Sequence, residues 1–162
     1  MTRTLTILIA MIFLCSSAFA AELKKMSLDD ASILGTTIQT DSNVKTEGQA
    51  SVRITTHFPT TICIGEFDGF DLENARLVYR AMVKSELNGS AYLEMWAHIG
   101  NGRYFSKGMN DPIRGQSDWK SIQTPFIFQK GQSPDKITLN LVINGQGTVW
   151  IDDVVLLKTP LK

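Results

Sequence analysis

One short segment of the chain gathers side chains that could do chemistry together. In AYLEMWAHIG, residues 91–100, a carboxylate (Glu94), an indole (Trp96) and an imidazole (His98) occur at every second position, and apolar residues stand between them. A period of two is typical of a β-strand with one face in a core and the other turned outward. The outward face could be a solvated sheet surface, a ligand platform or a catalytic site.

Catalysis fits these residues poorly. Glu94 and His98 are four residues apart, about 13 Å along a strand that rises ~3.3 Å per residue, which is too far for direct proton transfer. Glu94 could form a glycosidase-like pair with a carboxylate of another strand, such as Glu66. The sequence contains no nucleophile-elbow, zinc-protease or phosphate-loop motif that would support an enzyme. We therefore expect no enzymatic activity.

Sugar binding fits them better. It needs an aromatic ring against the apolar face of a pyranose and planar polar groups for the hydroxyls. If strands starting at Ala75 and Ala91 pair across an Asn88-Gly89 turn, Arg80 or Lys84 should lie beside Glu94 or Trp96. The expected ligand-binding residues are Arg80, Glu94, Trp96, His98, Tyr104, Trp119 and Asn140.

The alternative for this face needs no ligand. Glu94 would pair with Arg80 or Lys84, and Trp96 would pack under the loop GMNDPIRGQSDW, residues 108–119. Cross-strand pairs of this kind stabilise a sheet by roughly 0.2–1 kcal/mol.

The rest of the sequence predicts strands that would position this face. Apolar residues alternate in 77–83 and in 137–143, so each segment should turn one face to a core. The pairs Asn88-Gly89 and Asn144-Gly145 predict tight turns, because both residue types tolerate positive φ. Strands with a single apolar face need a second sheet to cover it. The expected fold is all-β, an antiparallel β-sandwich.

The N-terminus predicts a secretory signal peptide over residues 1–20. Arg3 precedes an apolar run at 5–14, and Ala18 and Ala20 occupy the positions that signal peptidase reads, so cleavage is expected after Ala20. The run is shorter than the ~20 residues that span a bilayer. The mature protein is expected to be secreted or periplasmic, with no membrane insertion after cleavage.

The mature chain is expected to hold a polar lead, residues 21–32, and one β-sandwich domain, residues 33–162. With 16 Lys and Arg, 16 Asp and Glu, and no basic stripe, nucleic acid is a poor partner. Cys15 leaves with the signal, so Cys63 remains alone and forms no internal disulfide. We expect Cys63 to be a small buried strand residue and not a nucleophile.

Four segments together resemble a known family. They are DSNVKTEGQASVRI (41–54), the strand with YLEMW (92–96), SDWKSIQTPF (117–126) and GQGTVWIDDVVLL (145–157). Their order and spacing resemble a secreted jelly-roll carbohydrate-binding module of the galactose-binding-like superfamily, over about residues 33–158. The resemblance implies a jelly roll that binds a glycan or polysaccharide without catalysis. The alternative is an envelope protein–protein interaction or structural β-sandwich domain, because sandwiches host many functions.

The same resemblance implies a structural calcium ion at the edge of the sandwich. The matching positions are Asp41, the carbonyls of Lys45 and Gly48, and Asp152 or Asp153. Calcium accepts carboxylate and carbonyl oxygens without a strict geometry. The alternative is that the inward-facing aspartate accepts backbone hydrogen bonds, since a buried carboxylate needs partners.

Overall fold

The computed structural model describes residues 20–26 and 38–161, so the predicted signal peptide lies almost wholly outside the described residues. The part of the chain that it describes contains no helix long and apolar enough to cross a membrane. Its regular secondary structure consists of strands. They are β1 (Ala21–Met26), β2 (Ile38–Asp41), β3 (Ser51–Thr56), β4 (Thr60–Asp68), β5 (Ala75–Ile99), β6 (Gly102–Lys107), β7 (Ile113–Phe128) and β8 (Lys136–Pro160).

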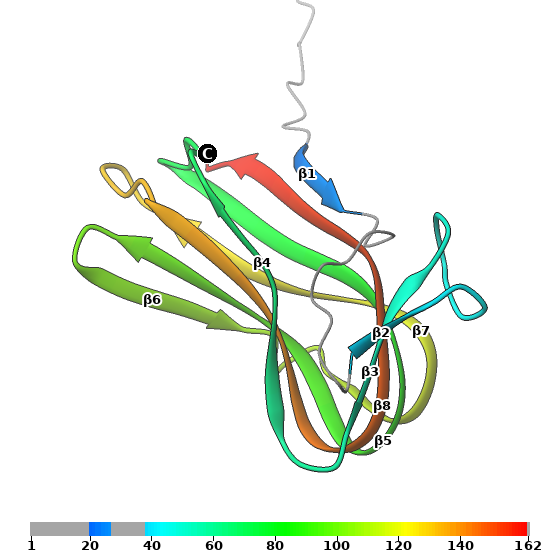
Figure 1. Cartoon of the computed structure of the whole chain (residues 1–162). Helices are drawn as coiled ribbons and strands as arrows, with labels where there is room; N and C mark the ends of the chain where they lie inside the picture. Colours follow the sequence, from blue (N-terminus) through cyan, green and yellow to red (C-terminus); the bar gives the residue numbers. More distant parts are fainter. Residues whose placement is uncertain (1–19, 27–37, 162) are drawn as a thin grey trace, which may run out of the picture.

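Two long strands, β5 and β8, form the centre of the molecule. They pair antiparallel over their whole length, from Ala75 opposite Pro160 to His98 opposite Lys136. Both strands bend in the middle, at the bottom of the view in Figure 1, so that each half belongs to a different sheet. The bend replaces the separate short strands that the sequence predicts.

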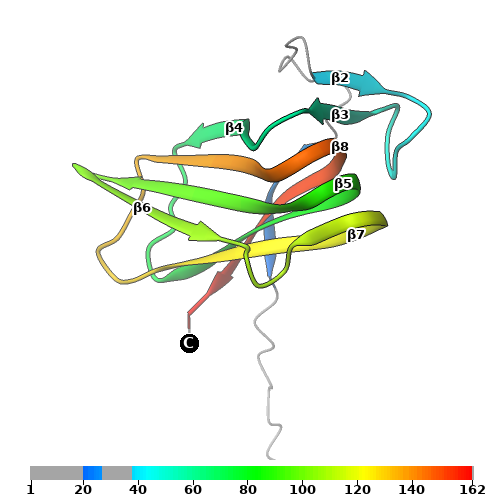
Figure 2. The ribbon, with the colours of Figure 1, turned by 90° about the horizontal axis from the view of Figure 1, so that it is seen from below.

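The other strands extend these two halves into two sheets (Figure 2). The first sheet has the order β4–β8–β5–β6 and uses β8 from about residue 136 to 143 and β5 from 91 to 99. The second sheet has the order β2–β3–β8–β5–β7, and β1 pairs with the last part of β8. All pairings are antiparallel. The predicted antiparallel β-sandwich is confirmed.

The two Asn-Gly pairs lie at the bend and not in hairpin turns, so this prediction is wrong. Gly89 (φ 144°) and Gly145 (φ 153°) lie opposite each other where the paired strands β5 and β8 bend. A Cβ at Gly89 would come within 2.1 Å of the Asn144 carbonyl oxygen, and one at Gly145 within 2.3 Å of the Asn88 carbonyl oxygen. Glycine is therefore needed here for close backbone approach and for positive φ, and the chain continues as a strand.

The core lies between the sheets and follows the predicted alternation. Every second residue of β5 and β8 points inward on both sides of the bend. Most of the residues predicted from this period are at most 1% exposed: Leu77, Tyr79, Ala81, Val83, Leu93, Met95, Ala97, Ile137, Leu139, Leu141 and Ile143. Ile99, at the end of β5, was predicted to face the core as well and is only half-buried.

Two local predictions are wrong. Residues 21–26, predicted as part of a polar lead, form β1, which adds backbone hydrogen bonds along the edge of β8. Cys63, predicted to be buried, is exposed on β4. The pairing of β4 with β8 shifts register between Cys63 and Gly65, which leaves Ile64 pointing into the core and Cys63 outward.

Candidate functional site

The outer face of the first sheet carries the polar residues of AYLEMWAHIG. Residues directly opposite each other in neighbouring strands point to the same face. Trp96 therefore shares a row with Thr138 of β8 and Phe105 of β6, and the rows of Glu94 and His98 lie on either side. We call this surface the platform; it consists of Glu66, Glu94, Trp96, His98, Arg103, Phe105, Lys107, Lys136, Thr138 and Asn140.

Trp96 is held in one orientation at the middle of the platform. Its indole Nε1 donates a hydrogen bond to Glu94 Oε1 at 2.7 Å. Its ring packs against Phe105, with ring centroids 5.1 Å apart and planes tilted by 50°. Trp96 is half-buried by these neighbours and keeps part of its ring accessible. The ring can therefore serve as a preorganised stacking surface.

Glu94 lies under this surface and is only 6% exposed. Besides Trp96, it accepts a hydrogen bond from Asn140 Nδ2 at 3.1 Å and forms an ion pair with Lys107 Nζ at 3.3 Å. These three partners satisfy a carboxylate that would otherwise be costly to bury. The predicted pairing of Glu94 with Arg80 or Lys84 is wrong, because Lys107 of β6 fills that role.

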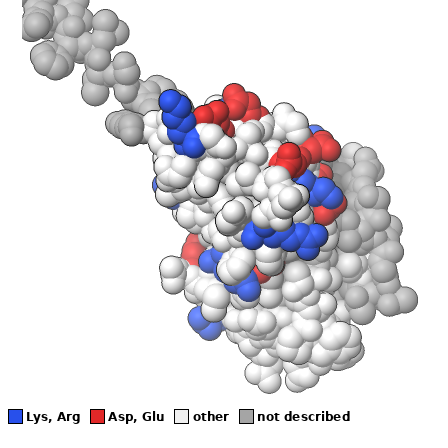
Figure 3. Space-filling model, turned by 90° about the vertical axis from the view of Figure 1, so that its left-hand side faces the viewer, with Lys and Arg blue, Asp and Glu red and all other residues white. Residues whose placement is uncertain are grey.

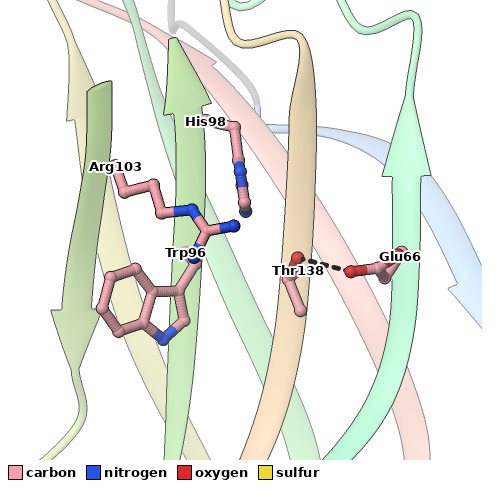
Figure 4. A pocket seen from close by; sticks show the side chains of 5 residues that line it. All are labelled: Glu66, Trp96, His98, Arg103 and Thr138. Carbon is pink, nitrogen blue, oxygen red and sulfur yellow. Dashed lines mark hydrogen bonds between the residues drawn. The ribbon is translucent and has the colours of Figure 1, made fainter. Parts of the chain in front are cut away.

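A pocket of about 240 Å³ opens beside Trp96, lined by Glu66, Trp96, His98, Arg103 and Thr138 (Figure 4). Glu66 accepts hydrogen bonds at 3.1 Å from Lys136 Nζ and from Thr138 Oγ1. Those bonds, the one from Lys136 first, hold the pKa of the Glu66 carboxyl below its ordinary value. The pocket is smaller than the roughly 300–1,000 Å³ that encloses a drug-sized ligand, so it suits one unit of a longer chain.

Basic and acidic side chains are mixed on the left-hand side of the molecule as drawn in Figure 1, where β6 projects. Figure 3 views the molecule from the side where β4 and β6 lie in Figure 1, and it shows basic and acidic side chains interspersed with uncharged surface. A mixed surface of this kind does not attract a polyanion such as nucleic acid over its whole area.

Of the seven predicted ligand-binding residues, four meet on the platform: Glu94, Trp96, His98 and Asn140. Arg80 does not, because it precedes the bend and lies in the second sheet between Gln123 and Val155. Trp119 does not either, because it belongs to β7 of the second sheet.

Tyr104 is also placed away from the platform. It lies opposite Ala97, a core residue, so it points to the inner side of the first sheet. There it stays half exposed at the edge, with its ring against the backbone of Gly102. The neighbouring Phe105 takes the place on the platform that was expected for Tyr104.

The platform residues that the sequence analysis missed are Arg103, Phe105, Lys107, Lys136 and Thr138. A signal for two of them exists in the segment IGNGRYF. The two-residue turn at 100–101 puts Ile99 opposite Gly102, and counting outward from that pair sets Arg103 against His98 and Phe105 against Trp96. The turn length therefore determines which aromatic residue faces outward.

The residues predicted to bind calcium lie at the other end of the molecule. Asp152 is fully buried, and its Oδ2 accepts hydrogen bonds from Thr46 N (2.6 Å), Thr46 Oγ1 (2.8 Å) and Glu47 N (3.1 Å). Its Oδ1 accepts one from Asp153 N at 2.8 Å. Asp153 lies 3.4 Å from Lys25 Nζ in an ion pair.

Asp41 is bonded in a similar way. Its carboxylate accepts hydrogen bonds from the backbone of Asn43 and Val44 and from Trp150 Nε1, and the bond from Trp150 is the main cause of its lowered pKa. Lys45 Nζ donates a hydrogen bond to Gln49 O at 2.9 Å. Gly48 has φ 63°, the left-handed conformation that glycine favours.

The carboxylate oxygens of Asp152 and Asp41 are surrounded by N–H and O–H donors. A cation would need these same oxygens as ligands, so this arrangement does not fit one. The described residues contain no group of three or more His, Cys, Asp or Glu that could hold a metal ion. Calcium binding stays an implication of the resemblance, and the hydrogen bonds seen here favour the alternative, an inward-facing aspartate bonded by backbone donors.

No protein-family model and no curated protein matches the chain, but solved structures match its fold. The CBM22-1 xylan-binding domain from Paenibacillus barcinonensis Xyn10C matches 91% of this chain and 100% of its own at 12% identity, with a TM-score of 0.58. The CBM22-1–GH10 modules of a Clostridium thermocellum endo-1,4-beta-D-xylanase, complexed with xylohexaose, match at 13% identity and a TM-score of 0.58, over 84% of this chain and 28% of that one.

A family 16 carbohydrate-binding module matches 80% of this chain and 92% of its own at 10% identity, with a TM-score of 0.56. The fold is therefore the jelly-roll β-sandwich of carbohydrate-binding modules, as the sequence resemblance predicts. At these identities the likeness establishes the fold and leaves the ligand to be argued from the platform.

Proposed function

We propose that the protein is an exported, non-catalytic module that binds carbohydrate on the platform. The observation that carries this proposal is the indole of Trp96, fixed by Glu94 and Phe105 beside a pocket lined with hydrogen-bonding groups. A pyranose ring can stack its C–H face on Trp96 while its hydroxyls reach the pocket wall. The similar folds, two of them named for xylan or crystallised with xylohexaose, support the same class of ligand.

Each wall of the pocket offers a different partner to a sugar. Glu66 accepts hydrogen bonds, Thr138 donates or accepts, and Arg103 donates through a planar fork that matches adjacent oxygens. Phe105 is 56% exposed beside Trp96 and extends the apolar surface along the sheet. A chain of several sugar units could therefore lie across the strands.

The carboxylates of the platform argue for binding without catalysis. A glycosidase needs a carboxylic acid with a raised pKa to protonate the leaving group. The pKa of Glu66 is instead lowered by Lys136 and Thr138, and Glu94 is buried with its oxygens taken by Trp96, Asn140 and Lys107. Neither is arranged as a general acid.

Glycan-array screening of the mature protein, followed by titration calorimetry with the best ligand and with xylohexaose, tests the proposal. Trp96→Ala should weaken binding about tenfold or more, because stacking on an aromatic ring contributes roughly 1–2 kcal/mol. Trp119→Ala is the matched control, since it removes an indole from the second sheet and should leave binding unchanged. Absence of binding to any glycan by the wild type would contradict the proposal.

Export has its own test. If residues 1–20 are removed as a signal peptide, protein recovered from the producing cell begins at Ala21. N-terminal sequencing reads this directly. Intact Met1 on protein from the cytosol would overturn this part of the proposal.

A further inference from the structure

One cation of the platform has no counter-charge. Lys107 lies 3.3 Å from Glu94, and Lys136 lies 3.1 Å from Glu66, so each lysine is paired with a carboxylate. Arg103 lines the pocket, yet no carboxylate of the described residues lies within ion-pair distance of its guanidinium. The platform therefore keeps one unpaired positive charge at its binding pocket.

The guanidinium is aimed at the pocket. Arg103 lies opposite His98 in the pairing of β5 with β6. Figure 4 shows its side chain extending from β6 toward the imidazole of His98, with the indole of Trp96 below. Two groups that donate hydrogen bonds to an anion, a guanidinium and an imidazole, thus meet beside the stacking surface.

The opposite wall does not cancel this charge. Glu66 stands on β4, separated from β6 by β8 and β5. Its negative charge is already paired with Lys136, and it also accepts a hydrogen bond from the hydroxyl of Thr138. The pocket is therefore polarised, with a cationic wall on β6 and a neutralised acceptor wall on β4.

On the basis of the proposed carbohydrate-binding function, we propose that the platform selects acidic sugars, with Arg103 and His98 binding the carboxylate of a uronic acid unit. A guanidinium pairs with a carboxylate through two parallel hydrogen bonds, a geometry that ammonium groups cannot provide. The carboxylate of a uronic acid projects from the edge of the pyranose ring. A ring stacked on Trp96 can point that edge toward β6, while Glu66 on the other wall accepts hydrogen bonds from the sugar hydroxyls.

Matched oligosaccharides test the inference by calorimetry. The neutral ligand is xylohexaose, and the acidic ligands are a xylo-oligosaccharide with one glucuronic acid branch and an oligogalacturonate. Wild type should bind at least one acidic ligand about tenfold more tightly than xylohexaose, as charged hydrogen bonds allow. Preference for the branched or the galacturonate ligand distinguishes a side-chain uronate from a backbone uronate. The preference should shrink between 0.05 M and 0.5 M salt.

Variants assign the preference to a residue. Arg103→Gln should abolish the acidic preference, because it should weaken binding of the acidic ligand by a larger factor than binding of xylohexaose, and Arg103→Lys should retain part of the preference. Arg76→Gln is the matched control, since it removes an exposed charge from the part of β5 in the second sheet. Circular dichroism checks that each variant is folded.

The outcomes separate the two proposals. Equal affinity of wild type for neutral and acidic ligands would overturn the acidic preference and leave carbohydrate binding intact. An acidic preference that survives in Arg103→Gln would overturn the role of Arg103. No binding to any sugar would refute the proposed function itself, and the inference with it.

Discussion

The protein contains two buried carboxylates that are satisfied in different ways. Glu94, 6% exposed, is bonded by the side chains of Trp96, Asn140 and Lys107, which come from three neighbouring strands of the first sheet. Asp152, fully buried, is bonded mainly by backbone N–H groups, two of them from the segment between β2 and β3. One carboxylate orients a surface, and the other attaches a length of chain to β8.

Because of this difference, we expect substitution of the two carboxylates to have different main effects, one on stability and the other on binding. Backbone donors cannot move away without remodelling the loop, so losing Asp152 leaves them buried without an acceptor. Side-chain donors at the outer face can turn toward water when Glu94 is lost. Substitution at Asp152 should therefore affect folding first, and substitution at Glu94 should affect binding first.

The largest effect is expected for Asp152→Ala. It leaves the N–H groups of Thr46 and Glu47 and the hydroxyl of Thr46 without their acceptor, which should lower the free energy of unfolding by about 3 kcal/mol or more. Urea unfolding measures the loss. Asp118→Ala, which removes an exposed carboxylate paired with Lys84, is the control and should change stability by no more than about 0.5 kcal/mol.

Glu94→Ala should have a smaller effect on stability, about 1–2 kcal/mol, and a clear effect on sugar binding. Without Glu94 the indole of Trp96 loses the hydrogen bond that orients it. Glu94→Gln keeps an oxygen acceptor for that bond and should restore most of the affinity, although it loses the charge opposite Lys107. Binding that is equally poor in both variants would show that charge, and not orientation, is the contribution of Glu94.

Tyr79 differs from both carboxylates, because its buried hydroxyl has no hydrogen-bond partner among the described residues. Burial also raises the pKa of this phenol, so it stays neutral. Tyr79→Phe removes the unsatisfied group and should stabilise the protein by about 1 kcal/mol in the same urea experiment. A loss of stability would mean that the hydroxyl has a partner, such as a buried water.

The smallest effect is expected from calcium. With N–H and O–H groups directed at Asp152, neither millimolar calcium nor a chelator should change the melting temperature. If the loop instead rearranges to coordinate the ion, a hundredfold excess over the dissociation constant would add about 2.7 kcal/mol. In that case the response should vanish in Asp152→Asn.

The alternation of apolar residues predicted the core of β5 and β8 because burial depends only on which face a side chain takes. It also placed Trp96 and His98 outward for the same reason. The prediction of hairpin turns at the Asn-Gly pairs was wrong because the conformational freedom of glycine suits a bend in two paired strands as well as it suits a turn. Because of that single error, Arg80 was expected on the platform, although it lies in the second sheet.

The outer residues of β6 could not be predicted from local pattern, since both Tyr104 and Phe105 are aromatic and stand on opposite faces. Only the register across the turn decides between them. The partners of Asp152 could not be predicted from the sequence either, because they come from a segment about a hundred residues away in the chain. Contacts of that kind depend on the tertiary fold and leave no periodic signal.

The continuous course of β5 and β8 through both sheets has a consequence for how the chain reaches its native state. β5 and β8 form the central pair of both sheets. When the pair forms in one sheet, it therefore also brings together the halves of β5 and β8 that belong to the other sheet. Their contacts join distant parts of the chain, which makes the search for them slow. A half-formed sandwich would have its apolar face open to water and no independent register, so the molecule should fold in one all-or-none step.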